Sequence, residues 1–117
     1  MLAEKFEDLR IWQSARSLVS WTYRQFAASK DYSFRDQVQR ASISVMNNIA
    51  EGFERGTKKD FARFLDQAKG SAGEVRSMLY AAEDLSYLTA VLAEEGRAHC
   101  LQLSKGIAAL TKSLRAQ

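Results

Sequence analysis

The two side chains best suited to chemistry, the only histidine and the only cysteine, are neighbours in the sequence, His99 and Cys100. Adjacent residues of a helix point about 100° apart, so this pair cannot share a metal ion or form a cysteine–histidine nucleophile. Glu95 precedes His99 by four residues, but the Glu-x-x-His motif of di-iron bundles is missing. We therefore predict no catalytic residue, no metal, no cofactor and no enzymatic activity.

The segment from Arg40 to Gly56 is rich in polar residues and glycine. It lacks the Gly-Lys-Ser/Thr ending of a phosphate-binding loop, so we interpret Gly52 as a helix-packing position and Gly56 as a left-handed helix terminator. Asn48 falls on the apolar face of this helix, and a buried amide must find partners. We expect Asn48 to fix the helix register by bonding the start of the next helix or another subunit; an RNA or ligand contact is the alternative. Glu51 lies on the polar stripe of the same helix.

Basic residues outnumber acidic ones, 17 to 14, which gives a net charge of +3 and a pI of about 9.2. Six bases gather around the second helix and the turn after it, and we predict these as nucleic-acid contacts: Arg35, Arg40, Arg55, Lys58, Lys59 and Arg63. Phosphate binding requires several such charges on one surface. Acids dilute this patch in a monomer, whereas a symmetric ring would multiply it, so oligomerisation decides its strength.

The elements that must position these residues are four helices, because apolar residues recur with a period near 3.6 along most of the chain. The expected segments are about 7–28, 33–55, 57–82 and 89–114, with a tight turn at 86–88 before the last. Ser33, Thr57 and Thr89 are the predicted N-caps of the last three. Short connections make neighbouring helices antiparallel, so the sequence predicts one all-α domain, residues 1–117, folded as an up-down four-helix bundle.

Two features hint at self-association. Trp12 and Trp21 lie nine residues apart and therefore on opposite faces of the first helix, so one can enter the core while the other fills a contact between subunits. An exposed, uninvolved Trp21 is the alternative. The third helix carries a run of small residues around Gly70, which would let a neighbouring helix approach closely.

Four ordered motifs resemble a known family. They are Phe6–Gln13 (FEDLRIWQ), Gln37–Ala41 (QVQRA), Asn48–Gly52 with Arg55 (NIAEG…R), and Lys59–Ser71 (KDFARFLDQAKGS). Together these motifs are similar to those of the four-helix-bundle proteins of the 23S rRNA intervening-sequence type, and the resemblance spans nearly the whole chain.

The resemblance implies an up-down bundle that assembles as a homopentameric ring and has no enzymatic activity. A related branch, the accessory proteins of diversity-generating retroelements, forms basic pentameric barrels that bind nucleic acid and a reverse transcriptase. We therefore expect a homo-oligomer that binds RNA or DNA through a basic surface. The alternative is a protein–protein adapter without nucleic-acid affinity, presenting grooves or Trp21 to its partner. With one cysteine and no apolar run of 18 residues, we expect a cytoplasmic protein without a membrane span.

Overall fold

The computed structural model describes residues 3–117, and within that range all regular structure is helical. A short 3₁₀ turn, η1 (Phe6–Asp8), precedes α1 (Arg10–Phe26), α2 (Tyr32–Glu54), α3 (Lys58–Asp84) and α4 (Ala90–Arg115). Each helix packs against two neighbours in the cyclic order α1, α2, α3, α4, and the bundle measures 45 × 19 × 19 Å. The predicted four-helix architecture is confirmed. None of these helices has the length and apolar character needed to cross a membrane.

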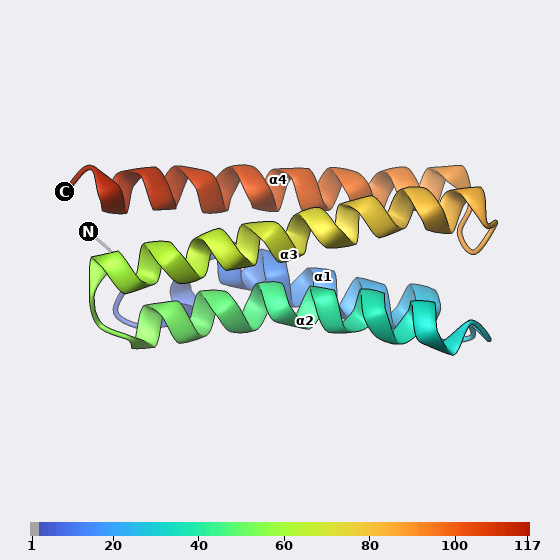
Figure 1. The fold of residues 1–117 in the computed structure, drawn as a ribbon, viewed down its shortest axis with the longest axis horizontal. Helices are drawn as coiled ribbons and strands as arrows, with labels where there is room; N and C mark the ends of the chain where they lie inside the picture. The colour runs from blue at the N-terminus through green and yellow to red at the C-terminus, as the bar shows by residue number, and fades with distance from the viewer. Residues whose placement is uncertain (1–2) are drawn as a thin grey trace.

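The helices alternate in direction, so their connections gather at two ends (Figure 1). The α1–α2 and α3–α4 connections lie at one end, whereas the α2–α3 turn lies at the other, near the carboxyl terminus. At about 1.5 Å per residue, α3 runs for about 40 Å, which is most of the length of the molecule. α3 packs along α2 on one flank and along α4 on the other.

Capping side chains begin three of the helices, and two of the three predicted caps are correct. The hydroxyls of Thr57 and Thr89 accept hydrogen bonds from the backbone N–H groups of Asp60 (3.1 Å) and Leu92 (3.2 Å). For α2 the predicted cap, Ser33, is wrong. Asp31 caps that helix by accepting from the Phe34 N–H at 3.1 Å.

The preference for Asp31 has a tertiary cause. Its second carboxylate oxygen accepts a 2.6 Å hydrogen bond from the hydroxyl of Tyr87, in the α3–α4 connection. That bond, and then the Phe34 N–H, lowers the pKa of Asp31, while the same contact raises the pKa of Tyr87. The capping carboxylate therefore also ties together the two connections at this end of the bundle.

The first helix is shorter than predicted. It begins at Arg10 instead of Glu7, because Leu9 adopts an extended conformation that places its side chain in the core, 8% exposed. It ends at Phe26 instead of Ala28. Gly56 takes φ = +84° directly before the Thr57 cap, which confirms its predicted role as the terminator of α2.

Two glycines allow helices to approach closely. A Cβ on Gly52 of α2 would lie 2.6 Å from the Cβ of Phe64 on α3. A Cβ on Gly96 of α4 would lie 2.7 Å from Leu79 Cδ1 and would also collide with the ring of Trp21. The predicted packing role of Gly52 is therefore correct. The prediction for Gly70 is wrong within the chain, because nothing lies within 4 Å of a Cβ built there.

The core is continuous from α1 to α4. Trp21 is buried, at 7% exposed, and Trp12 is the half-buried tryptophan, packed against Phe6 with ring centroids 5.2 Å apart. The alternative of an exposed Trp21 is therefore wrong. On α4, Val91 is 76% exposed, and the inner face instead carries small residues with Cys100 and aliphatic side chains: Ala93, Gly96, Cys100, Leu103, Ile107 and Leu114.

Candidate nucleic-acid interface

The six predicted phosphate contacts do not form one surface. Arg35 and Arg40 lie in the first half of α2, whereas Arg55 lies just past its end, about 30 Å from Arg35 at 1.5 Å per residue. Lys58, Lys59 and Arg63 open α3 at the Arg55 end. The prediction of a single cluster is therefore wrong, because spacing along one long helix separates its two halves.

At the α2–α3 turn, the arginines already have partners. Arg55 lies 3.8 Å from the carboxylate of Glu51, and Arg63 lies 3.6 Å from that of Asp60. Both guanidinium groups also lie over the ring of Phe64, 5.0 and 4.7 Å from its centroid. Of the predicted residues at this turn, only Lys58 and Lys59 form no ion pair in the described structure, so the turn offers a small net positive charge.

The first half of α2 is likewise balanced. Arg35 forms a 3.0 Å ion pair with Asp36 and lies over the ring of Tyr32. Arg40 lines a groove between α2 and α3 in which two carboxylates, Asp36 and Glu74, share the walls. This groove, which we call the α2–α3 groove, therefore carries both signs of charge.

Asn48 belongs to a hydroxyl network beside this groove. Its amide nitrogen donates to the backbone oxygen of Ser44 (2.9 Å) and to the Ser44 hydroxyl (3.1 Å), both on its own helix. The Ser44 hydroxyl in turn bonds that of Ser71 on α3 at 2.9 Å. The expected direct bond from Asn48 to the start of α3 is wrong; Ser44 makes the contact between the helices, in the middle of α3.

His99 and Cys100 diverge, as predicted. The Nε2 of His99 lies 3.0 Å from both the hydroxyl and the backbone oxygen of Ser14 on α1. The Cys100 thiol points into the core, where burial raises its pKa to about 12, despite an opposing effect from Arg76. A thiol with this pKa is protonated at neutral pH, and the thiol is a far weaker nucleophile than the thiolate. In residues 3–117, no group of three or more potential metal ligands is placed to hold a metal ion.

A second groove, on the other flank of α3, was missed by the sequence reasoning. Two ion pairs fix the register of α3 against α4: Asp66 with Arg115, and Glu83 with Arg97 at 2.9 Å. Because the helices are antiparallel, one turn forward on α3 matches one turn back on α4. Counting along the two helices from these anchors places the following residues at about the same level of the bundle: Lys69 and Lys112, Gly73 and Ala108, Arg76 and Lys105, and Tyr80 and Leu101.

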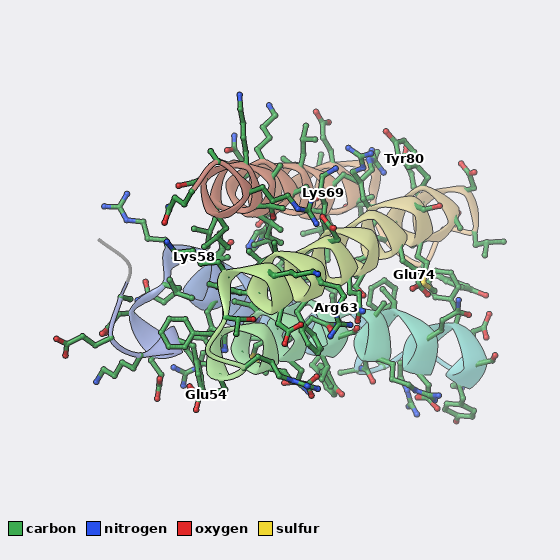
Figure 2. The ribbon with its side chains drawn as sticks, turned by 60° about the vertical axis from the view of Figure 1, so that its left-hand side comes forward. Glu54, Lys58, Arg63, Lys69, Glu74 and Tyr80 are labelled. Atoms are coloured by element: carbon green, nitrogen blue, oxygen red, sulfur yellow. The ribbon has the colours of Figure 1, made fainter. Side chains whose placement is uncertain are left out.

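We call this surface the α3–α4 groove, and its distinguishing property is the sign of its charge. Its lining contains three cations and no carboxylate: Lys69, Gly73, Arg76, Leu101, Ser104, Lys105 and Ala108. Lys112 lies two turns beyond Lys105 on the same face of α4. None of these four cations forms an ion pair in the described structure. Figure 2 shows Lys69 and Tyr80 on the side of α3 next to α4, with Glu74 toward α2.

A sequence signal for this groove did exist. Lys69 and Arg76, and again Lys105 and Lys112, are seven residues apart, so each pair lies on one face of its helix. What the sequence does not show is that the two faces meet. That requires the register of α3 against α4, which two ion pairs and the core packing establish.

Comparison with known proteins places the chain in a family. Residues 7–109 match the family described as 23S rRNA-intervening sequence protein. The chain belongs to this family. A search of curated proteins finds no match.

A solved structure supports the same architecture. A crystal structure from Bacteroides thetaiotaomicron, described as a protein with unknown function from the S23 ribosomal protein family, is similar to this chain with a TM-score of 0.81. The two chains are 19% identical, and the match covers 87% of this chain and 98% of that one. At this identity the likeness concerns the fold. The family match confirms the resemblance carried by the four sequence motifs.

Proposed function

We propose that this chain is a non-enzymatic bundle that associates with copies of itself and binds RNA or DNA through its basic surface. The observation that carries the proposal is the α3–α4 groove, where Lys69, Arg76 and Lys105 converge without a carboxylate among the lining residues. Converging cations that lack counter-charges are what binding to a phosphate backbone requires. Lys58 and Lys59, at the α2–α3 turn, supply a secondary contact.

Self-association is supported by exposed apolar side chains at one end of the bundle. Tyr32, Leu85 and Val91 are 60%, 53% and 76% exposed, and all three lie at or beside the connections that the Asp31–Tyr87 hydrogen bond ties together. Exposed apolar groups that lie together mark contacts with other proteins. We propose that this surface contacts another subunit, in a ring of the pentameric kind that the family resemblance implies.

The adapter alternative keeps one supporting observation. The burial of Trp21 removes its predicted contact residue, but the same apolar end could receive a different protein. Two results together would favour the adapter. A protein partner would be pulled down with this chain even after nuclease treatment, and the chain alone would have the mass of a monomer in solution.

Binding to a labelled fragment of structured rRNA, followed by fluorescence anisotropy, tests the nucleic-acid proposal. We expect binding at about 50 mM salt that weakens steeply toward 200 mM. The triple variant Lys69→Gln/Arg76→Gln/Lys105→Gln should reduce the slope of log K against log salt by about 2 to 3. The matched variant Lys58→Gln/Lys59→Gln should reduce it by less than 2. An absence of binding by the wild-type chain at about 50 mM salt contradicts the proposal.

Light scattering with and without nucleic acid tests the assembly. A mass equal to several chains supports self-association, and the substitution Val91→Glu should then lower that mass. A monomer under both conditions contradicts the ring and the multiplication of charge that it would bring.

A further inference from the structure

We infer that the α3–α4 groove holds a single-stranded nucleic acid, with its phosphates over the paired cations and one unpaired base stacked on Tyr80. The inference rests on the proposed function and adds to it the class of nucleic acid and the residue that selects it. Along the side of α3 that borders the groove, the side chains change from the charged Arg76 to the aromatic Tyr80 within about one helical turn (Figure 2).

The cations in the middle of the groove lack opposite charges among the lining residues. At both ends of the groove, α3 and α4 face each other with opposite charges, Asp66 with Arg115 and Glu83 with Arg97. Between these ends, cations from both helices, such as Arg76 and Lys105, line the same groove, and no carboxylate lies among its lining residues. If stability alone decided these residues, we would expect oppositely charged residues across the two helices here as well, because neighbouring like charges are destabilising. An anionic ligand between the two helices removes that repulsion.

Tyr80 supplies the aromatic surface next to these cations. Its side chain is 58% exposed, and the guanidinium of Arg97 lies 4.2 Å from the ring centroid. Arg97 is itself held in place, by Glu83 at 2.9 Å and by the backbone oxygen of Leu79 at 3.4 Å, and is 16% exposed. One face of the tyrosine ring is therefore backed by a fixed cation, which leaves the rest of the ring open to solvent. An aromatic ring presented in this way is a stacking platform for a base.

The distances along α3 suit a strand of nucleic acid. Arg76 precedes Tyr80 by four residues, about 6 Å, and Lys69 precedes it by eleven, about 16 Å. Stacked nucleotides advance by about 3.4 Å each, so the groove spans about five of them. Between the charged pairs lie Gly73 and Ala108, and nothing lies within 4 Å of a Cβ built on Gly73. The middle of the groove is therefore low enough for a strand to approach the helix backbones.

The platform favours a single strand over a duplex. In a double helix the bases are paired and stacked on each other, so a surface aromatic reaches only phosphates and sugars. In a single strand the base faces are free to stack on the protein. An acidic protein segment could satisfy the cations equally well, but it would leave the Tyr80 surface without a matching partner. We therefore assign the groove to a single strand.

The experiment compares two labelled RNAs, an unstructured single strand of about 12 nucleotides and a duplex of the same length, by anisotropy at about 50 mM salt. The substitution Tyr80→Ala should weaken binding of the single strand between about 5-fold and 150-fold, the range seen for loss of one stacked base. Binding of the duplex should change less than about 2-fold. Tyr80→Phe keeps the ring and should retain the affinity for the single strand. Tyr23→Ala, at an exposed tyrosine of α1, is the matched control and should leave both affinities unchanged.

Three outcomes overturn part of the argument, and they are distinct. No binding of either RNA by the wild-type chain overturns the proposed function, and the stacking inference with it. Binding that Tyr80→Ala leaves unchanged, or weakens equally for both RNAs, overturns the stacking inference alone. Displacement of the single strand by polyglutamate at matched charge, as readily as by unlabelled strand, shows a general polyanion site and also overturns the assignment. Circular dichroism of each variant confirms that the bundle is intact.

Discussion

The two grooves that flank α3 are built from the same helix but differ in how their charges are matched. In the α2–α3 groove, Arg40 shares the walls with Asp36 and Glu74, and a hydroxyl pair, Ser44 with Ser71, joins the helices. The α3–α4 groove is lined by three cations, and no carboxylate lies among its lining residues. The first groove therefore carries both signs of charge, whereas the second carries positive charge alone. This difference, and not the total charge of +3, is the reason for placing the proposed nucleic-acid contact in the α3–α4 groove.

The largest expected effect comes from introducing a carboxylate into the α3–α4 groove, so that it carries both signs of charge like the α2–α3 groove. Lys105→Glu would place a carboxylate opposite Arg76, so nucleic-acid affinity should fall roughly 100-fold at about 50 mM salt, through one lost phosphate contact and one new repulsion. The free energy of unfolding should rise by about 0.2–1 kcal/mol, as for an exposed ion pair. Anisotropy and urea unfolding measure the two effects on the same protein.

Arg40→Glu in the α2–α3 groove is the matched control for that charge reversal. It removes a cation that already has carboxylates around it, so we expect little loss of affinity. A similar loss from both reversals would mean that net charge alone governs binding, and the contrast between the grooves would fail.

A second prediction concerns the thiol beneath the α3–α4 groove. Burial raises the pKa of Cys100 from 9.0 to about 12 in the folded chain. Its contribution to stability is therefore complete below pH 9 and is lost as the pH rises toward 12, because only the unfolded chain readily releases the proton. By pH 11 the folded state should have lost about 2 kcal/mol relative to pH 8, since the slope cannot exceed about 1.4 kcal/mol per pH unit.

The variant Cys100→Ala isolates this effect, because all other ionisable groups are the same in both proteins. The difference in unfolding free energy between wild type and variant should shrink across pH 9–12. Arg76 counteracts the effect of burial, so Arg76→Gln should raise the pKa of the thiol further and slow its alkylation at high pH. If the difference in unfolding free energy between wild type and Cys100→Ala stayed constant with pH, the burial of the thiol would not raise its pKa, and this prediction would be wrong.

The sequence predicts features that depend on neighbouring residues well, but it predicts poorly which residues of different helices lie together. The caps Thr57 and Thr89 and the terminator Gly56 follow from residue type, because each acts within a few residues of itself. Ser33 was wrongly preferred to Asp31, because the competing cap is favoured by Tyr87, which lies 56 residues away. The family was also predictable, because its motifs are contiguous. The α3–α4 groove was not, because its cations come from two helices whose register is set elsewhere.

A third prediction compares two glycines, one at the α2–α3 contact and one in the α3–α4 groove. Gly52 faces Phe64 of α3 across the α2–α3 contact, where a Cβ would lie only 2.6 Å from the Phe64 Cβ. Gly52→Ala should therefore destabilise the bundle by about 1–2 kcal/mol through overpacking. Gly73→Ala meets open space in the α3–α4 groove and should stabilise α3 by up to about 1 kcal/mol through helix propensity. Urea unfolding of both variants checks the opposite signs; two changes of the same sign would contradict the contrast.

The smallest expected effect compares one hydroxyl from each groove. Ser71→Ala removes the 2.9 Å bond to Ser44 between α2 and α3 and should cost about 1 kcal/mol of unfolding free energy. Ser104 lines the α3–α4 groove and makes no side-chain hydrogen bond in the described structure, so Ser104→Ala should change stability by less than about 0.5 kcal/mol. Nucleic-acid affinity should be insensitive to Ser71→Ala. If that variant weakened binding as much as loss of a groove cation does, the hydroxyl network would have to contribute to the ligand site, and the two grooves could not be assigned separate roles.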